Sequence, residues 1–151
     1  MSVLSQVTKS YRAFATRSLC EKTKSALVVL SRDSDIPQFK KQLERLLKRN
    51  ILSFPAWDCL PYDRVSPSLD CTNQRVHTLT TLAEDNNQIV VTSVSGFAQY
   101  LPPRLSFLGE SLFLKKGEPY SFKKLNEYLQ EKGFNRVGIV YEPGDYAVRG
   151  D

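Results

Sequence analysis

The first 95 residues of this chain contain no glycine, and the first of its seven glycines is Gly96. A phosphate-binding loop of the GxxxxGK[ST] type needs glycines, because they let the backbone turn tightly and point its N–H groups at the anion. The sequence therefore excludes such a loop before Gly96. It is organised like a nucleotide-binding fold but shows no nucleotide-binding loop.

Histidine and cysteine are also scarce. His77 is the only histidine, and no cysteine or acidic residue stands at metal-ligand spacing from it, which disfavours a metal or triad role. Three cysteines, Cys20, Cys59 and Cys71, form no CxxC pair and are odd in number. This favours buried thiols in the reducing cytoplasm over a disulfide framework. No apolar run approaches 18 residues, so we predict no membrane span.

Positive charge is concentrated at the start of the chain. Residues 1–50 hold 11 Lys and Arg against 4 Asp and Glu, whereas the remainder holds 10 against 12. A basic segment can contact nucleic acid or an acidic partner, but helical spacing of these charges favours a solvated helix face. The first 24 residues have the composition of an organellar transit peptide. We favour an amphipathic first helix, because the following segments are continuous with it.

Short apolar runs alternate with helical patterns up to about residue 100. The runs at 26–30, 51–54 and 88–93 predict strands, and the first is typical of a strand buried on both faces of a parallel sheet. Asp33, Ser34 and Asp35 offer caps for a helix that begins near Pro37 and ends at Asn50. Residues 70–73 offer caps for a second helix. Apolar positions at helical spacing support both helices: Phe39, Leu43, Leu46 and Leu47 in the first, and Val76, Leu79 and Leu82 in the second. The alternation predicts an α/β domain with a parallel sheet.

Residues 111–114 predict a fourth strand, at the edge of the sheet. The sequence pattern then changes at KKGEP, residues 115–119. Apolar residues at helical spacing then predict a helix, with Gly133 just beyond its end; they are Phe122, Leu125 and Leu129. Residues 136–141 and 146–149 flank an EPGD turn and predict a hairpin. Its second strand ends as soon as it starts, which is typical of a fragment of a longer protein.

A proline-rich, aromatic loop follows the second predicted strand. Residues 54–70 read FPAWDCLPYDRVSPSLD, and prolines restrict both their own φ and the residue before them. The loop is therefore rigid and lies at a strand end, where α/β folds usually place function. Asp58 and Asp63 could form a carboxylate pair there, although aspartates that cap loops are commoner. Ser93 and Ser95 do not form a GxSxG elbow.

Three segments in this order resemble one family. They are FPAWDCLPYDRVSPSLD followed by Arg75, IVVTSVSGFAQYLPP, and the stretch from KKGEPY to YEPGDYAVRGD. Together they resemble the N-terminal region of bacterial transcription-repair coupling factors, over residues 26–151. The same region is similar to UvrB, the damage-recognition protein of excision repair. UvrB-like chains have a phosphate loop and a long Tyr-rich hairpin; this chain has neither, which fits the coupling factor and its degenerate nucleotide site.

The resemblance implies a fold and a binding site. It implies an N-terminal helix (1–25), a parallel-sheet, helicase-like α/β domain of degenerate P-loop type (26–114), and the start of a smaller α+β domain (115–151). In the family this last domain docks UvrA, with the arginine of the VRG motif as a contact. Arg149 occupies that position, and we place Tyr146 in the same surface. Where UvrB-like proteins have a further arginine, this chain has Ala147, so a thinner interface is expected.

By this resemblance the chain is a non-enzymatic part of a larger protein. The intact protein is expected to be a cytoplasmic, ATP-dependent DNA translocase that uses ATP and Mg²⁺, acts on double-stranded DNA, releases stalled RNA polymerase and recruits UvrA. No cofactor or metal is expected in these residues. Two alternatives stay open: a fragment of a UvrB-type ATPase that binds damaged DNA, and a free-standing basic nucleic-acid-binding module. From the residues alone, Arg149 could equally be an exposed sheet arginine without a partner.

Overall fold

The computed structural model describes residues 7–60, 62, 64–108, 112 and 114–149. The chain divides into two compact units, which we call the first unit (Met1–Glu110) and the second unit (Ser111–Asp151). Among the described residues, no helix has the length and apolar character needed to cross a membrane.

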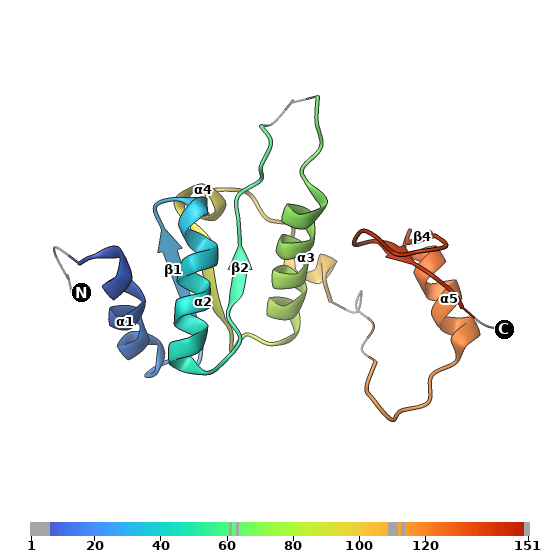
Figure 1. The fold of residues 1–151 in the computed structure, drawn as a ribbon, viewed down its shortest axis with the longest axis horizontal. Helices are drawn as coiled ribbons and strands as arrows, with labels where there is room; N and C mark the ends of the chain where they lie inside the picture. The colour runs from blue at the N-terminus through green and yellow to red at the C-terminus, as the bar shows by residue number, and fades with distance from the viewer. Residues whose placement is uncertain (1–6, 61, 63, 109–111, 113, 150–151) are drawn as a thin grey trace. The chain divides into compact units, whose positions relative to one another are not determined.

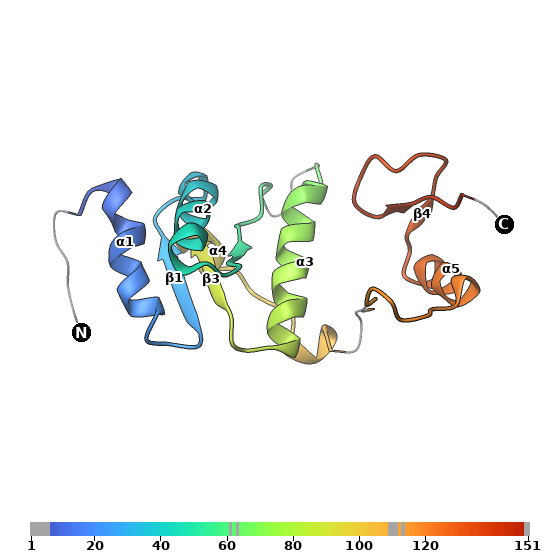
Figure 2. The same ribbon diagram turned by 60° about the horizontal axis from the view of Figure 1, so that its bottom comes forward.

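A three-stranded parallel sheet forms the centre of the first unit. It consists of β1 (Ala26–Leu30), β2 (Leu52–Phe54) and β3 (Ile89–Ser93) in the order β1-β3-β2, so both other strands pair with β3. All five residues of β3 are buried, and Figure 2 shows β1 and β3 running side by side. The predicted α/β fold with a parallel sheet is confirmed.

Helices cover both faces of this sheet, as Figure 1 shows. They are α1 (Lys9–Cys20), α2 (Ile36–Leu47), α3 (Leu69–Glu84) and the single turn α4 (Val94–Phe97), with 3-10 turns η1 (Asp33–Asp35) and η2 (Arg104–Ser106). Pro37 lies in the first turn of α2, as predicted. That helix ends before the predicted Asn50, because Lys48 adopts a left-handed conformation with φ of 52°.

The main core lies between the sheet and the first two helices. Successive side chains of a strand point to opposite faces, so one set from each strand meets α1 and α2. The buried members are Ala13 and Cys20 from α1, Ile36, Phe39 and Leu43 from α2, and Leu30, Ile51, Ile89 and Val91 from the strands and their ends. The helical spacing of the α2 residues predicted this face correctly.

The opposite face of the sheet is only partly covered. Leu79 and Leu82 of α3 pack on a smaller core made by β2 and β3. Leu27 and Val29 of β1 also point to this face, but they are 54% and 42% exposed. The prediction that residues 26–30 are buried on both faces is therefore wrong, because α3 packs against β2 rather than β1.

The second unit contains α5 (Phe122–Glu131), β4 (Asn135–Arg136) and β5 (Asp145–Tyr146). Ser121 caps the helix by accepting a hydrogen bond from the N–H of Lys124. Gly133 follows the helix with φ of 80°, a conformation that favours glycine. The helix predicted from apolar spacing, and its glycine stop, are confirmed.

The two strands of this unit run parallel, so the predicted hairpin is wrong. Residues 137–144 lie between β4 and β5, which makes the connection longer than the roughly two to five residues usual for a hairpin loop. The tight turn at Glu142–Asp145 lies at the end of this connection, next to β5. The predicted edge strand at 111–114 falls partly outside the described residues, since Ser111 and Phe113 are not described. Leu112 and Leu114 lie in no strand.

Gly96 in α4 allows a close approach of backbone to β2, and this generates a first prediction. A Cβ at this position would lie 2.6 Å from Thr92 Oγ1, 3.1 Å from Phe54 O and 3.2 Å from Ala56 N. The hydroxyl cannot move freely, because it donates to Phe54 O. We expect Gly96→Ala to lower the free energy of unfolding in urea by roughly 1–3 kcal/mol. The exposed neighbour variant Ser95→Ala should stay within about 0.5 kcal/mol; equal values for the two would contradict the close approach.

Candidate functional site

The carboxyl ends of the three parallel strands are joined by one carboxylate. Asp33, just after β1, accepts the N–H of Ala56 beyond β2 on Oδ1 and the hydroxyl of Ser93 at the end of β3 on Oδ2, each at 2.8 Å. Ser93 Oγ in turn accepts the N–H of Gly96 at 2.9 Å. The sequence suggested both Asp33 and Asp35 as caps of α2. Asp35 occupies the N-cap position, although without a side-chain cap bond, whereas Asp33 does not cap the helix.

The hydrogen bonds of Asp33 determine what the carboxyl ends of the strands can bind. In open α/β sheets, ligands bind outside the carboxyl ends of the strands, and phosphates need free N–H donors there. Here Asp33 brings a negative charge to that edge and accepts from Ala56 and Ser93. Ser93 donates a hydrogen bond to this carboxylate and is fully buried, so its oxygen is not accessible to a substrate. The edge is built to hold its own loops together.

A buried arginine holds the proline-rich loop against the sheet. Arg75 of α3 is 3% exposed, and its guanidinium carbon lies 4.0 Å from the centre of the Phe54 ring and 4.1 Å from that of Trp57. Its Nη1 donates to Pro55 O at 2.5 Å and to Gln99 Oε1 at 2.9 Å. The same Gln99 oxygen accepts the N–H of Trp57. One side chain thus connects α3, the loop after β2 and the segment after α4.

The charge of Arg75 is balanced mainly by aromatic rings and neutral oxygens. Within the described residues no carboxylate lies at ion-pair distance from it, and its Nε is buried without a hydrogen-bond partner. Burial lowers the pKa of Arg75, while Cys71 and Asp33 partly oppose the shift. Arginine suits this position because its planar group can stack between two rings and still donate in its own plane.

Most other candidate residues have structural roles. Asp58 accepts the N–H of Ser68, the N-cap of α3, and hydrogen bonding by the Ser68 side chain and backbone lowers the pKa of Asp58. This fits the loop-capping interpretation; Asp63, its suggested partner, lies outside the described residues. His77 is exposed on α3. In the part of the chain that the structure describes, no group of three His, Cys, Asp or Glu residues could hold a metal ion.

The two residues that we assigned to a partner surface lie in and after β5. Tyr146 is 8% exposed, and its hydroxyl has no hydrogen-bond partner among the described residues. Arg149 follows it on the same segment, is exposed, and makes no hydrogen bond or ion pair with other described residues. The structure therefore presents Arg149 to solvent and holds Tyr146 inside the second unit.

Sequence reasoning missed the roles of Asp33, Arg75 and Gln99. Asp33 and Ser93 are 60 residues apart, and Arg75 and Gln99 are 24 apart, so no local pattern connects them. Arg75 at mid-helix looks like any exposed helical arginine. The one available signal was the cluster of aromatics in residues 54–70, whose ring faces attract guanidinium groups.

Arg75 also generates a prediction. Arg75→Lys keeps the charge but loses the planar stack between Phe54 and Trp57 and part of the hydrogen bonding. We expect the free energy of unfolding to fall by roughly 2–4 kcal/mol. Urea unfolding followed by the fluorescence of Trp57, the only tryptophan, measures this directly. The control Arg45→Lys, on the exposed side of α2, should leave the midpoint unchanged; matching midpoints for both variants would mean that the stack adds no stability.

Comparison with known proteins finds several that are similar in sequence to this chain. No protein-family profile matches it. It is 30% identical over 149 residues to the transcription-repair-coupling factor of Rickettsia bellii, 29% identical to that of Haemophilus influenzae and 26% identical to that of Escherichia coli. These similarities cover 97–98% of this chain but 13% of each relative. The chain thus spans about an eighth of the length of these proteins.

The similarity and the earlier resemblance agree. The relatives bear the name that the segments from FPAWDCLPYD to YEPGDYAVRGD indicated, and the similarity extends beyond those segments to nearly the whole chain. This chain therefore belongs to the family of the transcription-repair-coupling factors.

Proposed function

We propose that this chain recruits the excision-repair protein UvrA, as the adaptor part of a protein that couples transcription to repair. The observation that carries this proposal is the similarity to transcription-repair-coupling factors over 97% of the chain, together with the exposed Arg149 at its VRG motif. In this proposal the intact protein is an ATP-dependent DNA translocase that displaces stalled RNA polymerase, and its motor lies outside these residues.

Arg149 has the chemistry that such a contact needs. Its guanidinium presents several N–H donors in one plane, which can bind a carboxylate through two parallel hydrogen bonds. It makes no hydrogen bond or ion pair with other described residues that would have to break before it binds a partner protein. An acidic residue of UvrA is the complement that we infer.

Tyr146 would act in this surface by position rather than by contact. Its ring is buried, and Tyr146 O accepts the N–H of Val137, which joins β5 to the segment after β4. Fixing β5 in this way fixes the direction in which the chain leaves toward Arg149. Ala147, between them, adds no second charge, so the proposed interface depends on few residues.

Arg149→Ala should weaken UvrA binding with little effect on folding. The expected loss is roughly 2–5 kcal/mol, the range for breaking a hydrogen-bonded charge pair at an interface, or about thirtyfold and more in affinity. The free energy of unfolding should change by about 0.5 kcal/mol at most, because Arg149 is exposed. Binding of purified UvrA by surface plasmon resonance and a melting curve measure the two effects.

Arg136→Ala is the matched control, since Arg136 is an exposed arginine in β4 of the same unit. It should leave UvrA binding unchanged. Equal binding by wild type and Arg149→Ala would remove Arg149 from the interface. Loss of binding together with a large melting shift would make Arg149 a structural residue.

The adaptor proposal also predicts that this chain does not bind Mg-ATP, which separates it from the UvrB-type ATPase. Asp33 places a carboxylate at the sheet edge and accepts from the donors beside it, and a negative charge there repels phosphates. Isothermal titration calorimetry of the 151-residue chain should give no saturable heat, with a UvrB protein as the positive control. Saturable binding at micromolar concentration would revive the ATPase alternative.

A further inference from the structure

A groove runs along the outer edge of the sheet, beside β2. It lies between α2 and α3 and has a volume of about 580 Å³. Residues from α2, β2 and α3 line it, among them Lys40, Lys41, Leu52, Gln74 and His77. This volume is within the range of protein ligand sites, roughly 300–1,000 Å³. The groove belongs to the first unit, whereas Arg149 belongs to the second unit.

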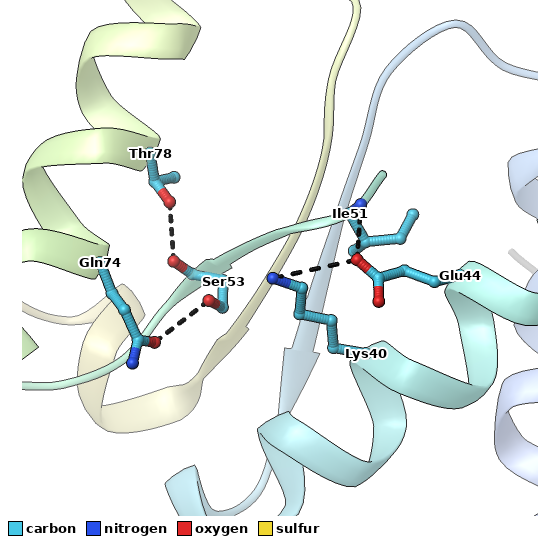
Figure 3. Close-up of polar contacts among 6 residues, drawn as sticks. All are labelled: Lys40, Glu44, Ile51, Ser53, Gln74 and Thr78. Carbon is cyan, nitrogen blue, oxygen red and sulfur yellow. Dashed lines mark hydrogen bonds and ion pairs between the residues drawn. The ribbon is translucent and has the colours of Figure 1, made fainter. Parts of the chain in front are cut away.

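The floor of the groove is a strand edge that no described strand pairs with. β2 pairs with β3 on one side only. On the other side, the N–H of Ile51 donates to Glu44 Oε1 at 3.2 Å, and Ser53 O accepts the hydroxyl of Thr78 at 2.7 Å. Figure 3 shows these side chains reaching β2 from α2 and from α3. Side chains thus occupy the positions in which a neighbouring strand would hydrogen-bond.

The bond to Glu44 can be exchanged for strand pairing at little cost. The bond from Thr78, which is buried, need not be broken, because Ser53 O has a second lone pair that can accept an incoming N–H. The Glu44 side chain is 30% exposed and also lies 3.9 Å from Lys40 Nζ, so it keeps a partner and water when it leaves Ile51. The bond lost by the N–H of Ile51 would be replaced by one to the backbone of the incoming segment. Edge strands with open backbone groups are the usual docking sites for extended peptides.

The charges of the groove specify the peptide. Lys40 and Lys41 lie on the α2 wall, and Lys41 makes no ion pair with other described residues. The single carboxylate of the lining, Glu44, is engaged by Lys40 and the N–H of Ile51. The α3 wall contributes the uncharged amide of Gln74 and the imidazole of His77. A segment with acidic side chains toward α2 is therefore complementary.

We propose that this groove binds an extended, acidic peptide segment of a partner protein, which adds to the sheet as a strand next to β2. Successive side chains of a strand alternate between faces. The acidic residues therefore face Lys40 and Lys41, and the intervening residues face α3, where Leu52 also lines the groove. A peptide is favoured over nucleic acid because the Ile51 N–H and Ser53 C=O lie at strand spacing along the floor without a described strand partner, whereas the net positive charge is small.

The test uses a fluorescein-labelled, eight-residue peptide of alternating glutamate and valine, titrated with the 151-residue chain in fluorescence anisotropy. Lys41→Ala should weaken binding at least tenfold, whereas Arg45→Ala should not. Arg45 is on the same helix and exposed but does not line the groove, so both variants lose one charge. A melting curve of each variant should match that of the wild type, because both positions are exposed.

A second probe separates strand addition from simple charge attraction. The same peptide with methyl groups on alternate backbone nitrogens keeps its charge but loses the N–H donors of one edge, and it should bind at least tenfold more weakly. Three results would each overturn the proposal: no binding of the unmodified peptide, equal binding of the methylated peptide, or equal weakening by Lys41→Ala and Arg45→Ala. A single-stranded oligonucleotide that binds more tightly than the peptide, and loses affinity with Lys41→Ala, would assign the groove to nucleic acid instead.

Discussion

The first unit depends on one carboxylate that connects the ends of all three strands. Asp33 follows β1 and accepts from Ala56 beyond β2 and from Ser93 at the end of β3. In a parallel sheet the strand ends are far apart in sequence, so their loops have no local reason to stay together. A hydrogen bond to a charged group is worth roughly 1.5–3 kcal/mol. Asp33 makes two, and through Ser93 it also fixes the N–H of Gly96 at the start of α4.

Arg75 of α3 holds the same loop after β2 that Asp33 contacts. It holds Pro55 and the rings of Phe54 and Trp57, and through Gln99 it reaches the segment after α4. The loop after β2 is therefore anchored twice: by Asp33 at Ala56, and by Arg75 on either side of that residue. Removing either anchor leaves buried polar groups unpaired, which costs more than the bond itself. The described part of the proline-rich loop is thus fixed near β2 by the buried Arg75 as well as by Asp33.

The structure shows which features a sequence of this kind reveals. Strands 26–30 and 89–93 and helix α2 were predictable, because their apolar spacing is a local property. Asp33 was misjudged since an aspartate just before a helix is a good local cap, and only the fold supplies the more distant donors that it uses. The direction of β5 was not predictable: two-residue strands have no periodicity, and the turn at Glu142–Asp145 does not by itself decide where the chain returns.

A sheet edge that binds phosphate must keep donors free, and buried donors without partners cost roughly 1–3 kcal/mol each until the ligand arrives. In the first unit, donors of Ala56, Ser93 and Gly96 are instead satisfied within the chain. The carboxyl ends of the strands therefore need no ligand to satisfy these donors. A hydrogen bond that can be exchanged lies elsewhere, at the side of β2, where the partly exposed Glu44 accepts the backbone N–H of Ile51. In the first unit, the hydrogen bonds at the carboxyl ends of the strands stabilise the fold, whereas the unpaired side of β2 can form new contacts.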